Sequence, residues 1–448
     1  MSRDLTKGSV WKHIIALAIS TFLGMAVQQF YSLADTAIVG QVLGADPLAG
    51  VGATGSLNFM IVFFCIGFCL GFAIPISREF GAKNHELMRR FTANGVFLGI
   101  ILTVVMSVAT CILCRTFLIW LQTPADILDY AHDYFIIICA GLACTIFYNL
   151  LSSILRGLGD TRTPLIAVVI SALVNIGLDF LFLITIPMGV AGAALATVIA
   201  QALSGVFCLV VLIRRFPMMH IRKEEWTLNS KLMKQLIGYG LPIGLQSSIT
   251  AIGTLILQAS VNSFGVEAVA GMTVATKISF FFDTPMESMG QIMTPFTAQN
   301  MGAKTYSRIK EALFKASAGG FACAILEFPI IFFFGKTFVH LFLESPSDQV
   351  MEYAYISMIC VGASSILLVI VNSFRFTIQG MGHTSLAMIS GVLEMIGRVI
   401  AAVFLSRLLG FTGIALGNTI AWILADCFLI PAFFICYRKL TEQKNRIV

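Results

Sequence analysis

The sequence predicts an all-α integral membrane protein with twelve transmembrane helices in two six-helix bundles. Three observations support this prediction: little charge, apolar segments long enough to cross a bilayer, and an internal repeat. Of the 448 residues, 58% are hydrophobic and only 12% are charged, whereas a soluble domain has about 25% charged residues. A soluble fold of this length could not cover its surface, so we expect lipid to surround the chain.

A spanning helix needs about 20 mainly apolar residues, and twelve segments meet this requirement. Helices are expected throughout, because an open sheet cannot satisfy its backbone in lipid. The first segment is too long for a signal peptide and lacks a small-residue cleavage site, so we interpret it as a span. The predicted spans are 13–42, 53–77, 91–121, 129–156, 163–186, 189–213, 234–263, 272–299, 311–343, 351–379, 386–408 and 412–437.

The basic residues predict the orientation of these spans. Most Lys and Arg residues fall at one set of helix ends, whereas only Arg115, Lys336 and Arg407 fall at the other set. Because Lys and Arg accumulate on the cytoplasmic side, we expect both termini in the cytoplasm of a multi-pass protein of the inner cell membrane. The net charge of +6 therefore reflects topology, and no nucleic-acid partner is expected.

The two halves of the chain resemble each other at a constant offset of 221 residues. "FGAKNHELMRR" from Phe80 matches "MGAKTYSRIKE" from Met301, and "GVAGAALATVIAQAL" from Gly189 matches "GFTGIALGNTIAWIL" from Gly410. The repeat predicts two copies of one six-helix unit in the same orientation, with a substrate cavity between them. We expect an N-lobe at 1–215, a cytoplasmic linker at 216–233, and a C-lobe at 234–448 with a short basic tail.

Four polar residues stand out within the spans of the first half. An ionised Asp at the centre of a spanning helix costs about 2.5–3.5 kcal/mol, so Asp35 and Asp179 each need a partner, a cation or a proton. Asn175 precedes Asp179 by four residues and shares its helix face, and Thr197 lies at a similar depth. Such oxygen atoms suit a small hard cation, and also a proton, because two adjacent acids cannot both stay charged alone.

The second half carries different polar residues. Span 8 contains Lys277, Asp283 and Glu287, which could line a cation-attracting cavity or form a second proton site. Alternatively, the two acids could form internal ion pairs with Lys277 or with Arg375. Glu394 and Arg398 are four residues apart, as in a structural helical pair. Asp179 falls near Val399 in the repeat, and Asp35 falls near Ile256 or Leu257. Because these positions are apolar, we expect the main ion site in the first half.

Several stretches resemble the multidrug and toxic compound extrusion (MATE) family, in the style of its DinF-like bacterial branch. They are "SLADTAIVGQVLGADPLAGVG", "LRGLGDTRTPL", "TAQNMGA" and "GVAGAALATVIAQ". The resemblance implies a MATE-type fold and a monomeric antiporter, in which H⁺ or Na⁺ influx drives export of small organic, often cationic or amphiphilic, compounds. The family's cation site falls on Asp35, Asn175, Asp179 and Thr197. No cofactor is implied beyond the coupling ion.

Other functional classes fit the sequence less well. A flippase for a lipid-linked or amphiphilic substrate would need a set of cations at membrane depth for a pyrophosphate, and only Lys277, Arg375 and Arg398 are available. An intramembrane enzyme would need a catalytic constellation that the sequence does not show. An ATP-driven pump is disfavoured, because the chain contains no phosphate-binding GxxxxGK[ST] motif.

One departure from the family concerns the first span. Members often carry Leu-Pro early in this span, and the second half retains it as Leu241-Pro242, but the first half has about Ile19-Ser20 instead. A proline-dependent bend of the first span is therefore not expected in this chain.

Overall fold

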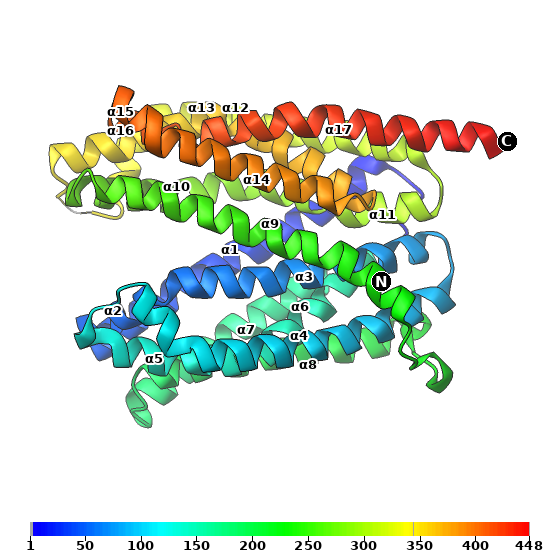
Figure 1. Cartoon of the computed structure of the whole chain (residues 1–448), viewed down its shortest axis with the longest axis horizontal. Coiled ribbons are helices and arrows are strands. Elements are labelled where there is room, and N and C mark those ends of the chain that lie inside the picture. The colour runs from blue at the N-terminus through cyan, green and yellow to red at the C-terminus, as the bar shows by residue number, and fades with distance from the viewer. Residues whose placement is uncertain (1–2, 344, 448) are drawn as a thin grey trace. The chain divides into compact units, whose positions relative to one another are not determined.

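The computed structural model describes residues 3–343 and 345–447. Side chains from residue 443 onward lie outside this description, and with them the end of the predicted basic tail. Within the described ranges every regular element is a helix, as the composition predicted (Figure 1). Two compact units are present: unit 1 is Met1–Asp4 with Leu23–Gly244, and unit 2 is Leu5–Phe22 with Leu245–Val448.

Two of the unit boundaries fall inside long helices, α1 (Val10–Leu43) and α9 (Ser230–Asn262). The start of α1 belongs to unit 2 and the rest belongs to unit 1, whereas α9 begins in unit 1 and ends in unit 2. Each helix is the first span of one repeat. Residues Val10, Ile14 and Leu17 are buried in the core of unit 2, which explains why the start of α1 belongs to that unit.

Unit 1 is completed by helices that pack around three apolar clusters. Phe72, Leu151 and Phe216 lie in the largest of these clusters. The remaining helices are α2 (Ala45–Ala53), α3 (Gly55–Gly81), α4 (His85–Trp120), α5 (Ala125–Ala140), α6 (Leu142–Gly157), α7 (Arg162–Phe180), the π-helix η1 (Leu181–Thr185), α8 (Val190–Arg215), and the short 3-10 helices η2 (Pro217–Met219) and η3 (Lys223–Glu225).

Unit 2 follows the same general order, with breaks at different places in some helices. Its largest cluster contains Phe296, Leu313 and Phe433. The helices are α10 (Val266–Gln291), α11 (Met293–Gly302), α12 (Tyr306–His340), α13 (Asp348–Gly380), α14 (Thr384–Ile400), the π-helix η4 (Ala401–Leu405), α15 (Ser406–Leu409), α16 (Phe411–Ala415) and α17 (Gly417–Ile447).

The backbone preserves the sequence repeat in its unusual conformations. Positive φ angles occur at Gly44 and Gly265, at Lys83 and Lys304, and at Gly189 and Gly410, and each pair is offset by 221 residues. The π-helices η1 and η4 also occupy corresponding places. Lysine rarely adopts positive φ, so its recurrence in both "GAK" turns shows that the two halves share one backbone design.

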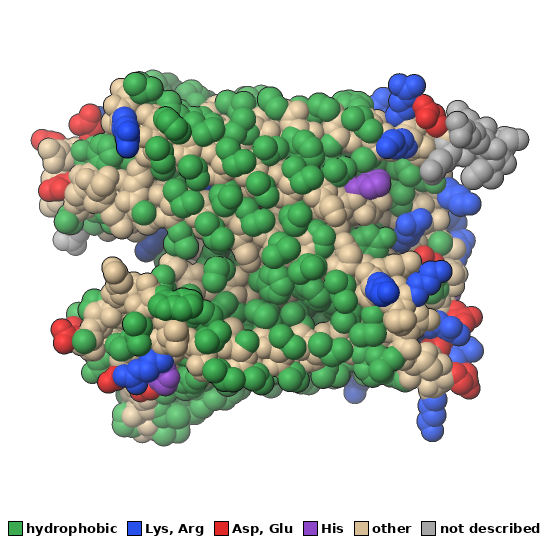
Figure 2. Space-filling model, in the orientation of Figure 1, with side chains coloured by type: hydrophobic (Ala, Val, Ile, Leu, Met, Phe, Trp, Pro, Cys, Tyr) green, Lys and Arg blue, Asp and Glu red, His purple; other side chains and the backbone are tan. Residues whose placement is uncertain are grey.

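The helices have the lengths and surfaces of membrane spans. Among the described residues, ten helices are long and apolar enough to cross a bilayer, and α5 with α6, bent by 46°, form an eleventh candidate. The predicted span at 272–299 falls on α10 and α11 and is not among them, because charged residues interrupt it. In each unit, charged side chains gather at the helix ends and hydrophobic side chains cover the middle (Figure 2).

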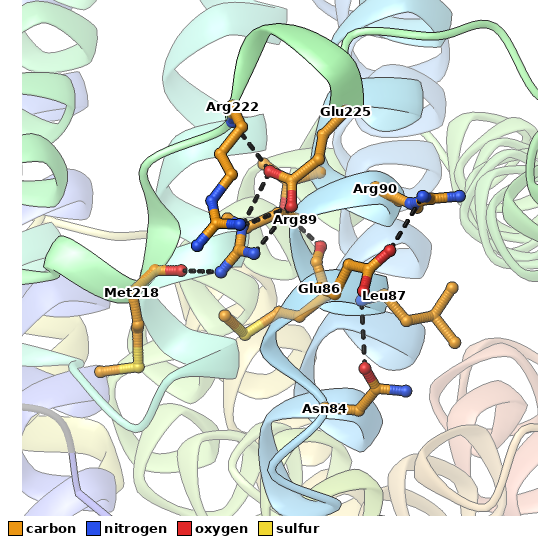
Figure 3. Close-up of polar contacts among 10 residues, drawn as sticks. Asn84, Glu86, Leu87, Arg89, Arg90, Met218, Arg222 and Glu225 are labelled. Carbon is orange, nitrogen blue, oxygen red and sulfur yellow. Dashed lines mark hydrogen bonds and ion pairs between the residues drawn. The ribbon is translucent and has the colours of Figure 1, made fainter.

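The segment that joins the two repeats is docked onto the beginning of α4 (Figure 3). Arg89 donates from Nε and Nη2 to the carboxylate of Glu225, with an Nη2–Oε1 distance of 2.7 Å, and its Nη1 donates to the Met218 carbonyl. The amide of Asn94 donates to the Thr227 carbonyl. The predicted linker is therefore an ordered part of unit 1.

Glu225→Gln should loosen this docked segment. The substitution breaks a buried ion pair, which costs about 3 kcal/mol, whereas Glu224→Gln alters an exposed neighbour. Thermal unfolding of the purified protein in detergent measures both. Equal midpoints for the two variants would contradict the prediction.

The contribution of Glu225 should not change between neutral and mildly acidic pH. Hydrogen bonds from Arg89 hold the pKa of the Glu225 carboxyl below its usual value. An acid with a lowered pKa stabilises the fold above its unfolded-state pKa, about 4.3, and loses this contribution as the pH falls through its folded-state value. The difference in unfolding midpoint between wild type and Glu225→Gln should therefore be equal at pH 8 and pH 6.

Candidate functional site

The acids predicted in the first half meet within unit 1. The carboxyl groups of Asp35 on α1 and Asp179 on α7 hydrogen-bond to each other. Asp179 is fully buried, and the Oδ1 atom of Asp35 is buried without a hydrogen-bond partner among the described residues. Because two carboxylates repel each other and neither can donate a hydrogen bond, this contact requires a proton or a cation between the two acids.

The other two predicted residues complete one side of this pair. The Asn175 amide donates to the Thr197 hydroxyl over 3.5 Å, which links α7 to α8. The hydroxyls of Tyr31 on α1 and Thr197 lie 3.4 Å apart. Three helices thus bring carboxyl, amide and hydroxyl groups together, and all four residues predicted for the first half lie in this one cluster.

Two tyrosines at the site were not predicted. The phenol groups of Tyr31 and Tyr134 lie close to both carboxyl groups. Tyr31 precedes Asp35 by one helical turn, so its shared helix face was a signal that could have found it. Tyr134 comes from α5, and no local pattern in the sequence connects α5 to α1 or α7.

Local sequence explains how α7 holds its acid. Before the helix begins, the Asp160 side chain accepts hydrogen bonds from the backbone N–H groups of Arg162 and Thr163 at 3.1 Å, which gives a structural role to the "LGDTRTP" motif. The helix changes to the π-helix η1 two residues after Asp179. Such insertions often accompany functional sites.

The donor set fits either a proton or a hard cation. Two carboxyl groups, an amide and hydroxyls are oxygen-rich ligands of the kind that hard cations prefer. Among the described residues, no group of three or more His, Cys, Asp or Glu side chains is suited to a metal ion. A Na⁺ ion bound here would therefore also depend on the oxygen atoms of Asn175 and Thr197.

The residues predicted on span 8 are divided between two environments. Lys277 is exposed and forms no ion pair with a described residue. Asp283 lies near Glu287 and near Glu327 of α12, and Glu287 accepts a hydrogen bond from Gln291 and lies near Arg375. Lys277 therefore forms no ion pair with Asp283 or Glu287, whereas Glu327 is a third acid that lies near Asp283.

Glu394 lies between two arginines in unit 2. It forms ion pairs with Arg375 of α13 and with Arg398, whose Nη2 lies 3.4 Å from Glu394 Oε2. The pair with Arg375 spans two helices and was not visible as a sequence pattern. The Nε atom of Arg375 also donates to the Ser390 hydroxyl.

The first span is continuous from Val10 to Leu43 and contains no proline. At the place where the family often has proline, Ser20 donates from its hydroxyl to the Ala16 carbonyl at 3.1 Å. Such back-bonding bends helices only slightly. In α9, the repeat counterpart of α1, Pro242 lies inside the helix.

A multi-pass helical bundle with paired acids inside its spans has the features of an ion-linked membrane transporter. The sequence profile of the family described as MatE matches residues 21–181 and 242–424. "Probable multidrug resistance protein YpnP" of Bacillus subtilis is 26% identical over 442 residues, which cover 97% of this chain and 96% of that protein.

Two crystal structures share the fold at 24% identity. The structure of MATE in complex with MaL6 has a TM-score of 0.90 and covers 98% of both chains. An outward-facing multidrug resistance MATE family transporter of the MOP superfamily has a TM-score of 0.90 and covers 99% of both chains. The chain belongs to the MatE family. It is a multi-pass membrane transporter, not an enzyme, and its predicted all-helical multi-span fold is confirmed.

Thr197→Val should weaken the link between α8 and the acid pair. The substitution keeps the volume but removes the hydroxyl that contacts both Tyr31 and Asn175, at a cost of about 1–2 kcal/mol. Thr197→Ser keeps the hydroxyl and should unfold close to wild type. Thermal unfolding in detergent compares the three proteins, and a Val variant as stable as the Ser variant would contradict this role.

Proposed function

We propose that this protein is a cation-coupled antiporter that exports organic, often cationic or amphiphilic, compounds by alternating access, with H⁺ or Na⁺ moving inward. Membership of the MatE family supports this function, as does the relative named as a multidrug resistance protein. The observation that carries the proposal is the direct contact between Asp35 and Asp179. Two acids in contact inside a membrane protein must share a proton or bind a cation.

Coupling follows from the charge of this pair. When the pair loses its cation, it becomes more negative and attracts either water or a cationic substrate. When H⁺ or Na⁺ returns, that attraction weakens and substrate leaves. The effect is reciprocal, because a cation that lowers substrate affinity has its own affinity lowered by substrate to the same extent. A membrane potential supplies about 2.3 kcal/mol per charge per 100 mV, which matches the scale of one buried acid.

The division of α1 supports a route for this effect. Asp35 lies in the part of α1 that belongs to unit 1, and residues before Leu23 belong to unit 2. A change in the environment of Asp35 therefore acts on a helix that is shared by both units. Without proline, we propose that α1 transmits the change by tilting as a continuous helix rather than by kinking.

Several finer assignments complete the proposal. We assign the chain to the DinF-like bacterial branch from its sequence motifs, with lobes at 1–215 and 234–448 joined by the linker at 216–233. The excess of basic residues at one set of helix ends favours cytoplasmic termini in the inner membrane. We propose a monomer as the working unit.

A flippase for lipid-linked sugars is the weaker alternative. Its pyrophosphate would need arginines that are free to bind it. Among the described residues, Arg375 and Arg398 both pair with Glu394, and Lys277 is exposed. These three cations therefore do not form a set that is free to bind a pyrophosphate. The acid pair of unit 1 has no role in that alternative.

Replacing either acid by its amide should abolish coupling. In inverted vesicles with a fluorescent cationic dye added outside, Asp35→Asn and Asp179→Asn should each reduce cation-driven dye uptake to background, because each variant leaves only one ionisable acid at the site. The double variant should be no worse than either single one, since groups that act as a unit are non-additive. Asp126→Asn, which alters an exposed acid, is the matched control. Unchanged transport in both single variants would overturn the site.

The coupling ion can be identified with purified protein in proteoliposomes. A pH gradient and a Na⁺ gradient are imposed separately, and dye movement is followed in each. We expect one gradient to drive transport in wild type and neither to drive it in Asp179→Asn. Transport that is independent of both gradients would overturn antiport.

A further inference from the structure

Unit 2 contains its own version of the three-helix arrangement that holds the acids in unit 1. The offset of 221 residues makes α9, α14 and α17 the counterparts of α1, α7 and α8. The segment 175–179 corresponds to 396–400, and Thr197 corresponds to Asn418. In both units, the helix that contains this segment continues into a π-helix. The equivalent place in unit 2 can therefore be examined residue by residue.

That place is occupied by the side chain of Arg398. Its Nε donates to Asn418 Oδ1 of α17 at 3.2 Å, its Nη1 donates to the Thr250 carbonyl of α9 at 3.4 Å, and its Nη2 lies 3.4 Å from Glu394 Oε2 of α14. The guanidinium is thus surrounded by oxygen atoms from three helices. These are the counterparts of the three helices that supply oxygen atoms in unit 1.

The surrounding structure is shaped to hold this group. The side chain of Arg398 is only 7% exposed. A Cβ atom on Gly253 of α9 would lie 3.2 Å from Arg398 Cδ, 3.2 Å from Met395 Cα and 3.3 Å from Arg398 Nη1. The absence of a side chain at Gly253 therefore lets both the Arg398 side chain and the backbone of α14 approach α9 closely.

We propose that the three-helix pocket of unit 2 is a second cation site, and that the cation bound there is the guanidinium group of the chain's own Arg398. The guanidinium takes the place in unit 2 that H⁺ or Na⁺ takes in unit 1. One part of this inference rests on the proposed function, namely that the cation of unit 1 can be exchanged. A cation that is covalently attached to the chain cannot dissociate, so an ion gradient cannot act through this pocket of unit 2.

The acids of the two units agree with this division. Unit 1 has two carboxyl groups that contact each other, and their negative charge must be neutralised by a mobile H⁺ or Na⁺. In unit 2 the positions of those acids are apolar, and Glu394 contacts Arg375 and Arg398 together. Its charge is therefore met by fixed cations. Removal of Arg398 should leave an oxygen-lined pocket that accepts a small cation from solution.

The test is chemical rescue of Arg398→Ala with the guanidinium ion. Unfolding midpoints of the full-length protein in detergent are measured in millimolar guanidinium chloride and in choline chloride of equal ionic strength. We expect a lower midpoint for Arg398→Ala and a saturable rise with guanidinium, because a ligand that binds only the folded state stabilises it. Wild type and Arg407→Ala, an exposed arginine variant, should respond equally and little to both salts.

Two further variants keep the proposal falsifiable if the alanine variant does not fold. Arg398→Lys keeps a cation, and Arg398→Met fills the volume without charge. We expect the midpoint of the lysine variant to lie closer to wild type than that of the methionine variant. The proposal would be overturned if guanidinium raised the unfolding midpoint of Arg398→Ala no more than that of Arg407→Ala. Equal midpoints for the Lys and Met variants would also overturn it. Because no transport is measured, these results are independent of whether Asp35 and Asp179 couple transport.

Discussion

The rest of the structure depends on one constraint, which is that a charge inside a membrane protein must be neutralised where it stands. Unit 1 meets this constraint with a carboxyl pair, Asp35 and Asp179, that requires a proton or cation from outside the chain. Around Glu394, unit 2 meets it with fixed arginines. In our proposal, the same physical requirement produces one site that can exchange its cation and one that cannot.

The two solutions are built on one backbone. Positive φ angles recur at Lys83 and Lys304, and a π-helix follows the counterpart segments in α7 and α14. A repeated scaffold fixes where side chains from the three helices meet, while the residues at those places decide the chemistry. Divergence at a few positions can then give the two halves different roles without any change of fold.

The candidate site was predictable to the extent that its residues are related by local periodicity or by burial cost. Asp35 and Asp179 were found because acids are expensive in apolar runs, and Asn175 was found because it lies one helical turn from Asp179. Tyr134 was missed, since a tyrosine in a span costs little and α5 has no sequence relation to α7. Arg375 was one possible partner for the acids of span 8, and it does lie near Glu287, but its ion pair with Glu394 was not predicted, because charge pairing between helices depends on packing.

The sequence by itself determined the helical membrane class, the approximate spans, the duplication and the presence of uncompensated acids. These features follow from composition and from short-range periodicity, which lipid and the helix backbone make nearly obligatory. Only the tertiary structure decided that Asp35 touches Asp179, that Glu225 fastens the linker to α4, and that Arg398 lies in an oxygen shell from three helices. Such contacts join different helices, most of them more than a hundred positions apart in the sequence, and their partners are selected by helix packing rather than by any local pattern.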